Sequence, residues 1–122
     1  MMPILWGHSM GGAGACHLAA RHPDFWAALA VAAPDPRAAA LDELELFRHV
    51  PVLVLHGDAD ATVSVEGSRT WVNRMRELGM QHVYLEFAGG DHSLFMLRNP
   101  ENLSRVFSFF DIARKNERSS AP

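Results

Sequence analysis

Cysteine, long apolar runs and excess basic charge are all scarce in this sequence of 122 residues. The single cysteine, Cys16, cannot form an internal disulfide, so cysteine usage indicates no compartment. No apolar run approaches the ~20 residues that span a bilayer, and no basic segment precedes an apolar stretch at the N-terminus, as in a signal peptide. With 11 Lys and Arg against 14 Asp and Glu, the chain has no basic surface for nucleic acid or an anionic membrane, and we expect neither as a partner.

The most informative motif that is present is Gly-His-Ser-Met-Gly at 7–11, which has the form G-x-S-x-G. An apolar run precedes it and a run of small residues follows it, which predicts a strand that turns sharply into a helix. A serine at the apex of such a turn has a strained backbone and an exposed hydroxyl, so Ser9 is the candidate nucleophile. We expect glycine at Gly7 and Gly11 because a Cβ at either position would collide with a neighbouring strand or helix. The alternative is that Ser9 is only a helix N-cap.

Two later segments carry the groups that an activated serine needs, a base and a group that orients the base. The apolar run 50–55 predicts a strand buried on both faces, and the turn after it carries Asp58 and Asp60. A further strand is predicted at 83–88, and His92 follows it closely. The candidate nucleophile, acid and base therefore each follow a predicted strand, in that chain order.

The role of the paired aspartates has alternatives. Aspartates after a strand are often only turn formers, because their side chains bond nearby amides. A metal site formed by His56, Asp58 and Asp60 is less favoured, since His56 lies at the end of a buried strand and no third external ligand is indicated. We expect no metal and no cofactor.

The remaining patterns complete a repeated alternation of strand and helix. They predict further strands at 2–6 and within 25–33, helices at 10–21, 64–78 and 100–115, a helical piece between 34 and 49, and a polar tail at 116–122. We find no repeat or linker, so residues 1–115 are predicted to form one domain. This order implies the α/β class, with a parallel sheet of about four strands, right-handed crossovers and flanking helices.

Apolar side chains on the predicted helices mark the faces expected to pack on the sheet. In the helix at 10–21 they are Ala13, Cys16, Leu18, Ala19 and Ala20. In the helix at 100–115 they are Leu103, Val106, Phe107, Phe110 and Ala113. The piece between 34 and 49 holds Leu41, Leu44, Leu46 and Phe47 among acidic residues, a pattern that suits an amphipathic helix.

Three motifs together resemble the α/β-hydrolase family. They are Gly-His-Ser-Met-Gly-Gly at 7–12, His-Gly-Asp-Ala-Asp at 56–60 and Gly-Gly-Asp-His-Ser at 89–93. Within that family the chain is most similar to esterase, dienelactone-hydrolase and prolyl-oligopeptidase-type catalytic domains. In the register of the family motif, Asp60 matches the triad acid, while Asp58 matches a turn residue that holds the loop.

The resemblance implies acyl transfer by a Ser-His-Asp triad of Ser9, His92 and Asp60. It places one oxyanion donor at the backbone N–H of Met10 and the other in a loop after an early strand, for which this sequence has no counterpart. Losing one such donor costs ~10²–10³ in rate, so we expect weak activity from this chain alone. The expected substrate is a small carboxylic ester. A peptide substrate, or a non-catalytic module that retains the triad, is the alternative.

The resemblance also bears on how much of the fold is present. The family sheet has four further strands before the serine turn, so the sequence corresponds to the C-terminal half of that fold and is expected to be truncated. The strand at 2–6 would then form an apolar edge, and such an edge invites pairing. We expect it to pair with a missing N-terminal half or with a second copy of the chain.

Overall fold

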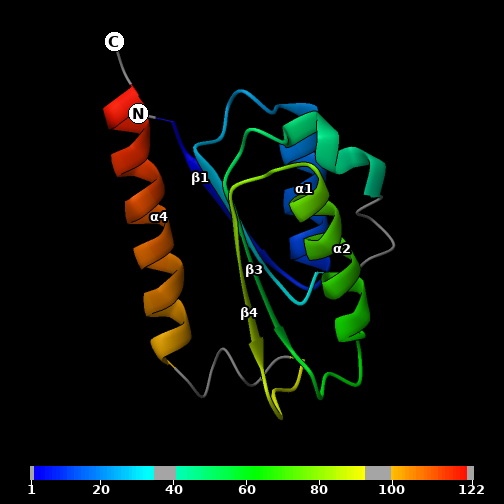
Figure 1. Ribbon diagram of the computed structural model, residues 1–122. Helices are drawn as coiled ribbons and strands as arrows, with labels where there is room; N and C mark the ends of the chain where they lie inside the picture. The colour runs from blue at the N-terminus through cyan, green and yellow to red at the C-terminus, as the bar shows by residue number, and fades with distance from the viewer. Residues whose placement is uncertain (1, 35–40, 93–99, 121–122) are drawn as a thin grey trace.

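The computed structural model describes residues 2–34, 41–92 and 100–120. Its centre is a parallel sheet in the order β1-β2-β3-β4, formed by β1 (Ile4–His8), β2 (Ala28–Ala32), β3 (Val52–Gly57) and β4 (His82–Phe87). One face carries α1 (Met10–Arg21), the 3-10 helix η1 (Leu41–Phe47) and α2 (Val65–Glu77), and the other carries α4 (Pro100–Ser120) (Figure 1). The predicted α/β class, with four parallel strands and flanking helices, is confirmed.

The two central strands are buried on both faces, as their continuous apolar sequences predict. Leu29 and Val31 of β2 face the core beneath α1, η1 and α2, whereas the alternating alanines of the same strand face α4. Cys16 of α1 is 1% exposed in the first of these cores, as predicted, and burial raises the pKa of its thiol. This thiol therefore serves as a small apolar side chain.

The ends of α2 follow the signals in the sequence. The Ser64 hydroxyl accepts a hydrogen bond from the Glu66 N–H at 3.2 Å, which caps the first turn. Gly79 follows the last turn with a φ of +68°, a conformation that suits glycine. The buried Trp71 and Met75 lie on the core face between these ends.

In α1 and α4 the expected apolar face includes side chains that the structure leaves exposed. Leu18 of α1 is 43% exposed, and Leu103 and Phe107 of α4 are 41% and 63% exposed, so these three predictions are wrong. The buried apolar stripe of α4 is Val106, Phe110 and Ala113, because this helix meets the sheet along a narrow line.

Other boundaries also differ from expectation. The first strand covers Ile4–His8 rather than 2–6, because Gly7 and His8 pair with Val31 and Ala32 of β2. Helix α4 continues to Ser120, so residues 116–120, expected in a polar tail, belong to the helix.

The piece after β2 is a 3-10 helix whose Leu44 and Phe47 are buried, while Leu46 is 56% exposed. The sequence at 94–97 is apolar, and we expect it to anchor the loop of His92, but it lies outside the described residues. No helix in the described ranges is long and apolar enough to cross a membrane.

The ends of β3 and β4 touch through two glycines. A Cβ on Gly57 would overlap the carbonyl oxygen of Gly90, and that carbonyl also accepts a hydrogen bond from the Ala59 N–H at 3.0 Å. The backbone on both sides is fixed by the sheet, so the overlap has no easy relief.

Gly57→Ala is therefore expected to lower the free energy of unfolding by more than ~2 kcal/mol. Gly14→Ala is the matched control, since Gly14 is exposed in α1 and a Cβ there meets nothing within 4 Å in the described structure. The control should leave stability unchanged or raise it by up to ~1 kcal/mol, through helix propensity. Urea unfolding of both variants measures this, and equal stabilities would contradict the close approach.

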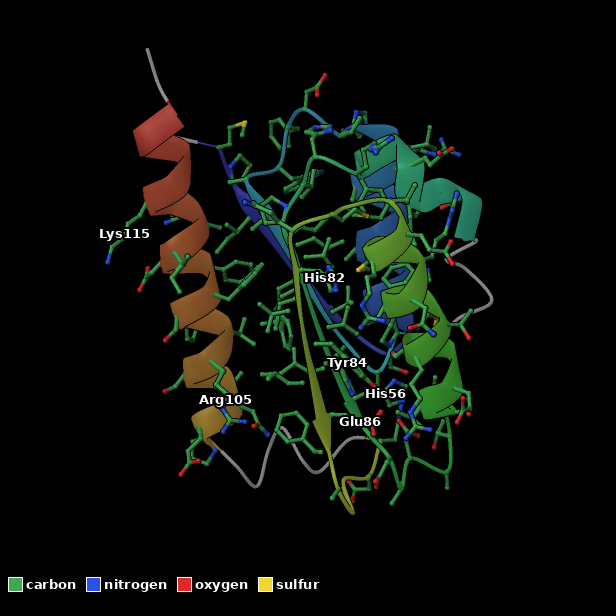
Figure 2. All side chains as sticks on the ribbon, in the orientation of Figure 1. His56, His82, Tyr84, Glu86, Arg105 and Lys115 are labelled. Carbon is green, nitrogen blue, oxygen red and sulfur yellow. The ribbon has the colours of Figure 1, made fainter. Side chains whose placement is uncertain are left out.

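An ion pair joins α2 to β4 on the surface. The Arg69 guanidinium donates to both carboxylate oxygens of Glu86 at 2.8 Å, and the Tyr84 hydroxyl donates to one of them at 2.7 Å. Figure 2 shows Tyr84 and Glu86 on the strand that faces this helix. The hydrogen bonds from Arg69 and then from Tyr84 lower the pKa of Glu86 from its ordinary 4.5 to about 2.

Because the pKa of Glu86 is depressed in the folded state, its contribution is present above about 4.5 and is lost as the pH falls toward about 2. Glu86→Gln should thus reduce stability at neutral pH, and its difference from wild type should disappear across that acid range. The pair is exposed, so the effect is modest and salt reduces it. Glu77→Gln, which breaks only a pair within α2, is the control. Thermal unfolding at several pH values measures both, and a difference that persists at pH 2 would contradict the assignment.

Candidate active site

Ser9 occupies the turn between β1 and α1. Its backbone has a φ of 56° and a ψ of -118°, which is strained for a residue other than glycine. Its N–H donates to the Ala32 carbonyl at 2.8 Å, so the neighbouring strand holds the turn in place. Ser9 occupies the N-cap position of α1, but its side chain makes no capping hydrogen bond, which contradicts the alternative that Ser9 serves only to cap the helix.

The two motif glycines have different roles. A Cβ on Gly7 would overlap the carbonyl oxygen of Gly11, so the expected close approach holds at Gly7. The expectation fails at Gly11 itself, because a Cβ there meets nothing within 4 Å in the part of the chain described. Gly12 is the second close position, since a Cβ on it would lie 3.2 Å from the Pro34 Cα.

His92 connects the serine to an aspartate. Its Nε2 lies 2.8 Å from the Ser9 hydroxyl oxygen, and its Nδ1 lies 2.8 Å from Oδ2 of Asp60. An ionised carboxylate only accepts, so Nδ1 carries the proton and Nε2 is left to accept from the Ser9 hydroxyl. The structure thus brings together three predicted side chains from positions 83 and 32 residues apart in the chain.

Asp60 is held as a carboxylate by several donors. Its side chain is fully buried, and its Oδ1 accepts from the Thr62 N–H at 2.9 Å and the Val63 N–H at 2.7 Å. Burial raises the pKa of Asp60, but the hydrogen bonds from Val63, His92 and Thr62 outweigh it and leave the pKa below its usual 3.8. The group facing His92 is therefore negative at neutral pH.

Asp58 faces another loop. Its Oδ1 accepts a hydrogen bond from the Gly89 N–H at 2.7 Å, which ties the turn after β3 to the turn after β4. Of the two aspartates, Asp60 is the one hydrogen-bonded to His92.

The metal alternative finds no support in the geometry. Both ring nitrogens of His56 are occupied, Nδ1 by the Ser68 hydroxyl at 2.7 Å and Nε2 by the Val63 carbonyl at 2.9 Å. Across residues 2–34, 41–92 and 100–120, no group of three or more His, Cys, Asp or Glu side chains could hold a metal ion.

Two histidines lie near the site although the sequence predicts no part for either of them in the triad. Nε2 of His8 lies 2.8 Å from the backbone carbonyl of His92, and the two rings are 5.1 Å apart. A carbonyl only accepts, so this nitrogen carries a proton and holds the loop of His92 against the serine turn. His56 lies behind Asp60, with its Nε2 3.3 Å from Oδ2. Both residues lie inside the motifs, but only coordinates reveal what their rings contact.

Met10, the residue after the serine, opens α1. Its N–H belongs to the first turn, where amides have no acceptor within the helix and the helix dipole favours negative charge. Its side chain is 78% exposed. This amide is therefore available to an oxygen beside Ser9.

The arrangement can move a proton from a hydroxyl to an imidazole and can stabilise the resulting imidazolium with a carboxylate. It also offers a helix N-terminus beside the hydroxyl for developing negative charge. Together these features allow nucleophilic attack by Ser9.

Comparisons with known proteins agree on one family. A model described as the alpha/beta hydrolase fold matches residues 3–50, and the model of the prolyl oligopeptidase family matches residues 35–116, most of the chain. No significant match was found among curated proteins.

Solved structures give the same result. A thermostable esterase is 25% identical, with a TM-score of 0.69 over 84% of this chain and 29% of that chain. Esterase PE8 is 27% identical, with a TM-score of 0.74 over 90% of this chain and 49% of that chain. An acylaminoacyl peptidase of Pyrococcus horikoshii has a TM-score of 0.75 over 87% of this chain and 23% of that chain. At 15% identity this likeness shows the fold alone. The chain spans less than half the length of each of these three proteins.

Proposed function

The chain belongs to the α/β-hydrolase family, in its prolyl oligopeptidase group, and on that premise we propose that it is a serine hydrolase that cleaves carboxylic esters through an acyl-enzyme. The observation that carries this proposal is the unbroken line of hydrogen bonds from Ser9 through His92 to Asp60. A merely structural serine has no need of a base at hydrogen-bond distance that is itself oriented by a buried carboxylate.

In the proposed reaction, Ser9 Oγ attacks the ester carbonyl while its proton passes to Nε2 of His92. Asp60 stabilises the imidazolium through Nδ1–H, and its depressed pKa keeps it ionised for this role. The imidazolium then protonates the leaving alcohol. Water repeats the sequence on the acyl-enzyme and restores the serine.

The oxygen of the tetrahedral intermediate would receive the Met10 N–H at the start of α1. In the family a second donor comes from a loop after an early strand, which has no counterpart among the residues described. Loss of one donor typically costs ~10²–10³ in rate, so the proposed activity of this chain alone is weak. Its chemical signature, a modifiable serine, is easier to detect than turnover.

An ester is proposed ahead of a peptide because two solved esterases are 25% and 27% identical to this chain. The second candidate, a serine peptidase, is favoured by the match to the prolyl oligopeptidase family over residues 35–116. A comparison of the turnover rates of p-nitrophenyl acyl esters and N-acyl-aminoacyl anilides separates the esterase from the peptidase. Faster release from the esters is expected, and the reverse order would favour the peptidase.

Ser9 is expected to react covalently with a fluorophosphonate probe, because its hydroxyl is the group activated by His92. Intact mass spectrometry should show one adduct on wild type and none on Ser9→Ala, while Ser104→Ala, an exposed control on α4, keeps the adduct. Folded wild-type protein that does not react would instead support a non-catalytic module with the same fold. Labelling that survives Ser9→Ala would place the nucleophile elsewhere.

The two aspartates should differ sharply in their effect on this reaction. Asp60→Asn is expected to lower the rate by ~10³–10⁴, because the amide can favour the wrong imidazole tautomer. Asp58→Asn removes a loop contact only and should change the rate by less than ~10-fold, at some cost in stability. Pseudo-first-order labelling rates, with unfolding curves for each variant, measure the difference. Equal rate losses in both variants would contradict the role proposed for Asp60.

A further inference from the structure

His56 is a fully buried polar residue at the end of β3, and the proposed reaction does not use it. Figure 2 shows its ring between the sheet and α2, close to Glu86 and far from His82 at the start of β4. A buried imidazole needs partners for both nitrogens. It has them in Ser68 of α2 and in the carbonyl of Val63.

These partners fix the tautomer of His56. The Val63 carbonyl only accepts, so Nε2 carries the proton, and Nδ1 of the neutral ring accepts from the Ser68 hydroxyl. The Nε2–H edge also lies 3.3 Å from Oδ2 of Asp60, the same oxygen that receives His92. Thus two imidazole N–H groups converge on one carboxylate oxygen.

The backbone of Val63 connects His56 to the other oxygen of Asp60. Its carbonyl accepts from His56, and its N–H, in the preceding peptide group, donates to Asp60 Oδ1 at 2.7 Å. A displaced His56 ring would therefore release the Val63 carbonyl and loosen the adjoining peptide group that orients the carboxylate. Because Ser68 is buried on α2, the ring itself is anchored on regular structure rather than on a loop.

We propose that His56 is a positioning residue, which holds the Asp60 carboxylate in line with His92 through the backbone of Val63 and through its own N–H edge. The proposal rests on the proposed function, since it concerns the same site. A hydrogen-bonded chain then runs from Ser68 through His56, Val63, Asp60 and His92 to Ser9. His92 is the closer partner of Oδ2, with its Nδ1 at 2.8 Å and His56 Nε2 at 3.3 Å.

A matched pair of variants isolates this role. His56→Gln can place an amide N–H near the position of Nε2 and so retain the donor to Val63. His56→Asn is shorter and reaches only the position of Nδ1, so it retains a partner for Ser68 but loses that donor. We expect His56→Asn to lower the fluorophosphonate labelling rate ~10- to 100-fold, as is typical for partners behind a functional group, and His56→Gln to stay within about threefold of wild type.

A second measurement needs no activity. The proton shared by His92 Nδ1 and Asp60 should give a low-field resonance in the proton NMR spectrum, assigned by its loss in Asp60→Asn. We expect it to persist in His56→Gln and to weaken or vanish in His56→Asn. His82→Gln, which disturbs only a contact to the Met80 carbonyl, is the control and should leave rate and resonance unchanged.

The outcomes separate this inference from the proposed function. An unreactive wild-type serine overturns the proposed function, while the resonance still tests His56. The positioning role is overturned if His56→Asn keeps the wild-type resonance and labelling rate. It is also overturned if His56→Asn and His56→Gln lose labelling rate and resonance equally, in proportion to their loss of stability. A folded wild type without the resonance overturns it as well. Should His56→Asn fail to fold, Ser68→Ala loosens the same ring more gently, and an unchanged resonance there also overturns the inference.

Discussion

The site depends on one constraint of the sheet, namely that its parallel strands all end at the same edge. Ser9 follows β1, Asp60 follows β3 and His92 follows β4, so side chains that are remote in sequence arrive at one rim. Parallel pairing with helical crossovers imposes this on any chain of the class, and binding sites at the carboxyl ends of strands result from it. What this chain adds is the fine placement, with two contacts of 2.8 Å at His92.

That placement requires strain at one residue and close backbone contact at two points, between Gly7 and Gly11 and between Gly57 and Gly90. The left-handed backbone of Ser9 costs ~1–3 kcal/mol, and it persists because β2 holds the Ser9 amide and because Gly7 lets α1 approach β1. Gly57 and Gly90 bring the turns after β3 and β4 together in the same way. The glycines thus convert a general topology into fixed distances among Ser9, Asp60 and His92.

Much of this could be predicted from the sequence because the signals are local. The apolar run of β3 and the predicted helix at 64–78 depend on signals within a few residues, and the structure has the buried strand and α2 (Val65–Glu77) there, with Ser64 as its cap and Gly79 just after its end. Faces and partners are not local. Leu103 and Phe107 carry the right pattern but lie off the narrow line where α4 meets the sheet, and Gly11 sits in the motif without the expected neighbour. The contact of His8 reaches across the fold to the carbonyl of His92, so nothing in its own segment could reveal it. The partners of His56 lie within 12 residues of it, but the path of the turn between β3 and α2 decides that they meet its ring.

The two histidines around Asp60 illustrate how burial assigns different roles to one residue type. His92 is partly exposed, with 16% of its side chain accessible, so its charged form can be hydrated while Asp60 supports it. His56 is fully enclosed, with Ser68 and Val63 at its two ring nitrogens and Oδ2 of Asp60 at 3.3 Å from Nε2. One imidazole therefore lies between the carboxylate and the Ser9 hydroxyl, and the other is held inside the core behind the same carboxylate. A buried carboxylate can serve both, since each of its oxygens accepts more than one hydrogen bond.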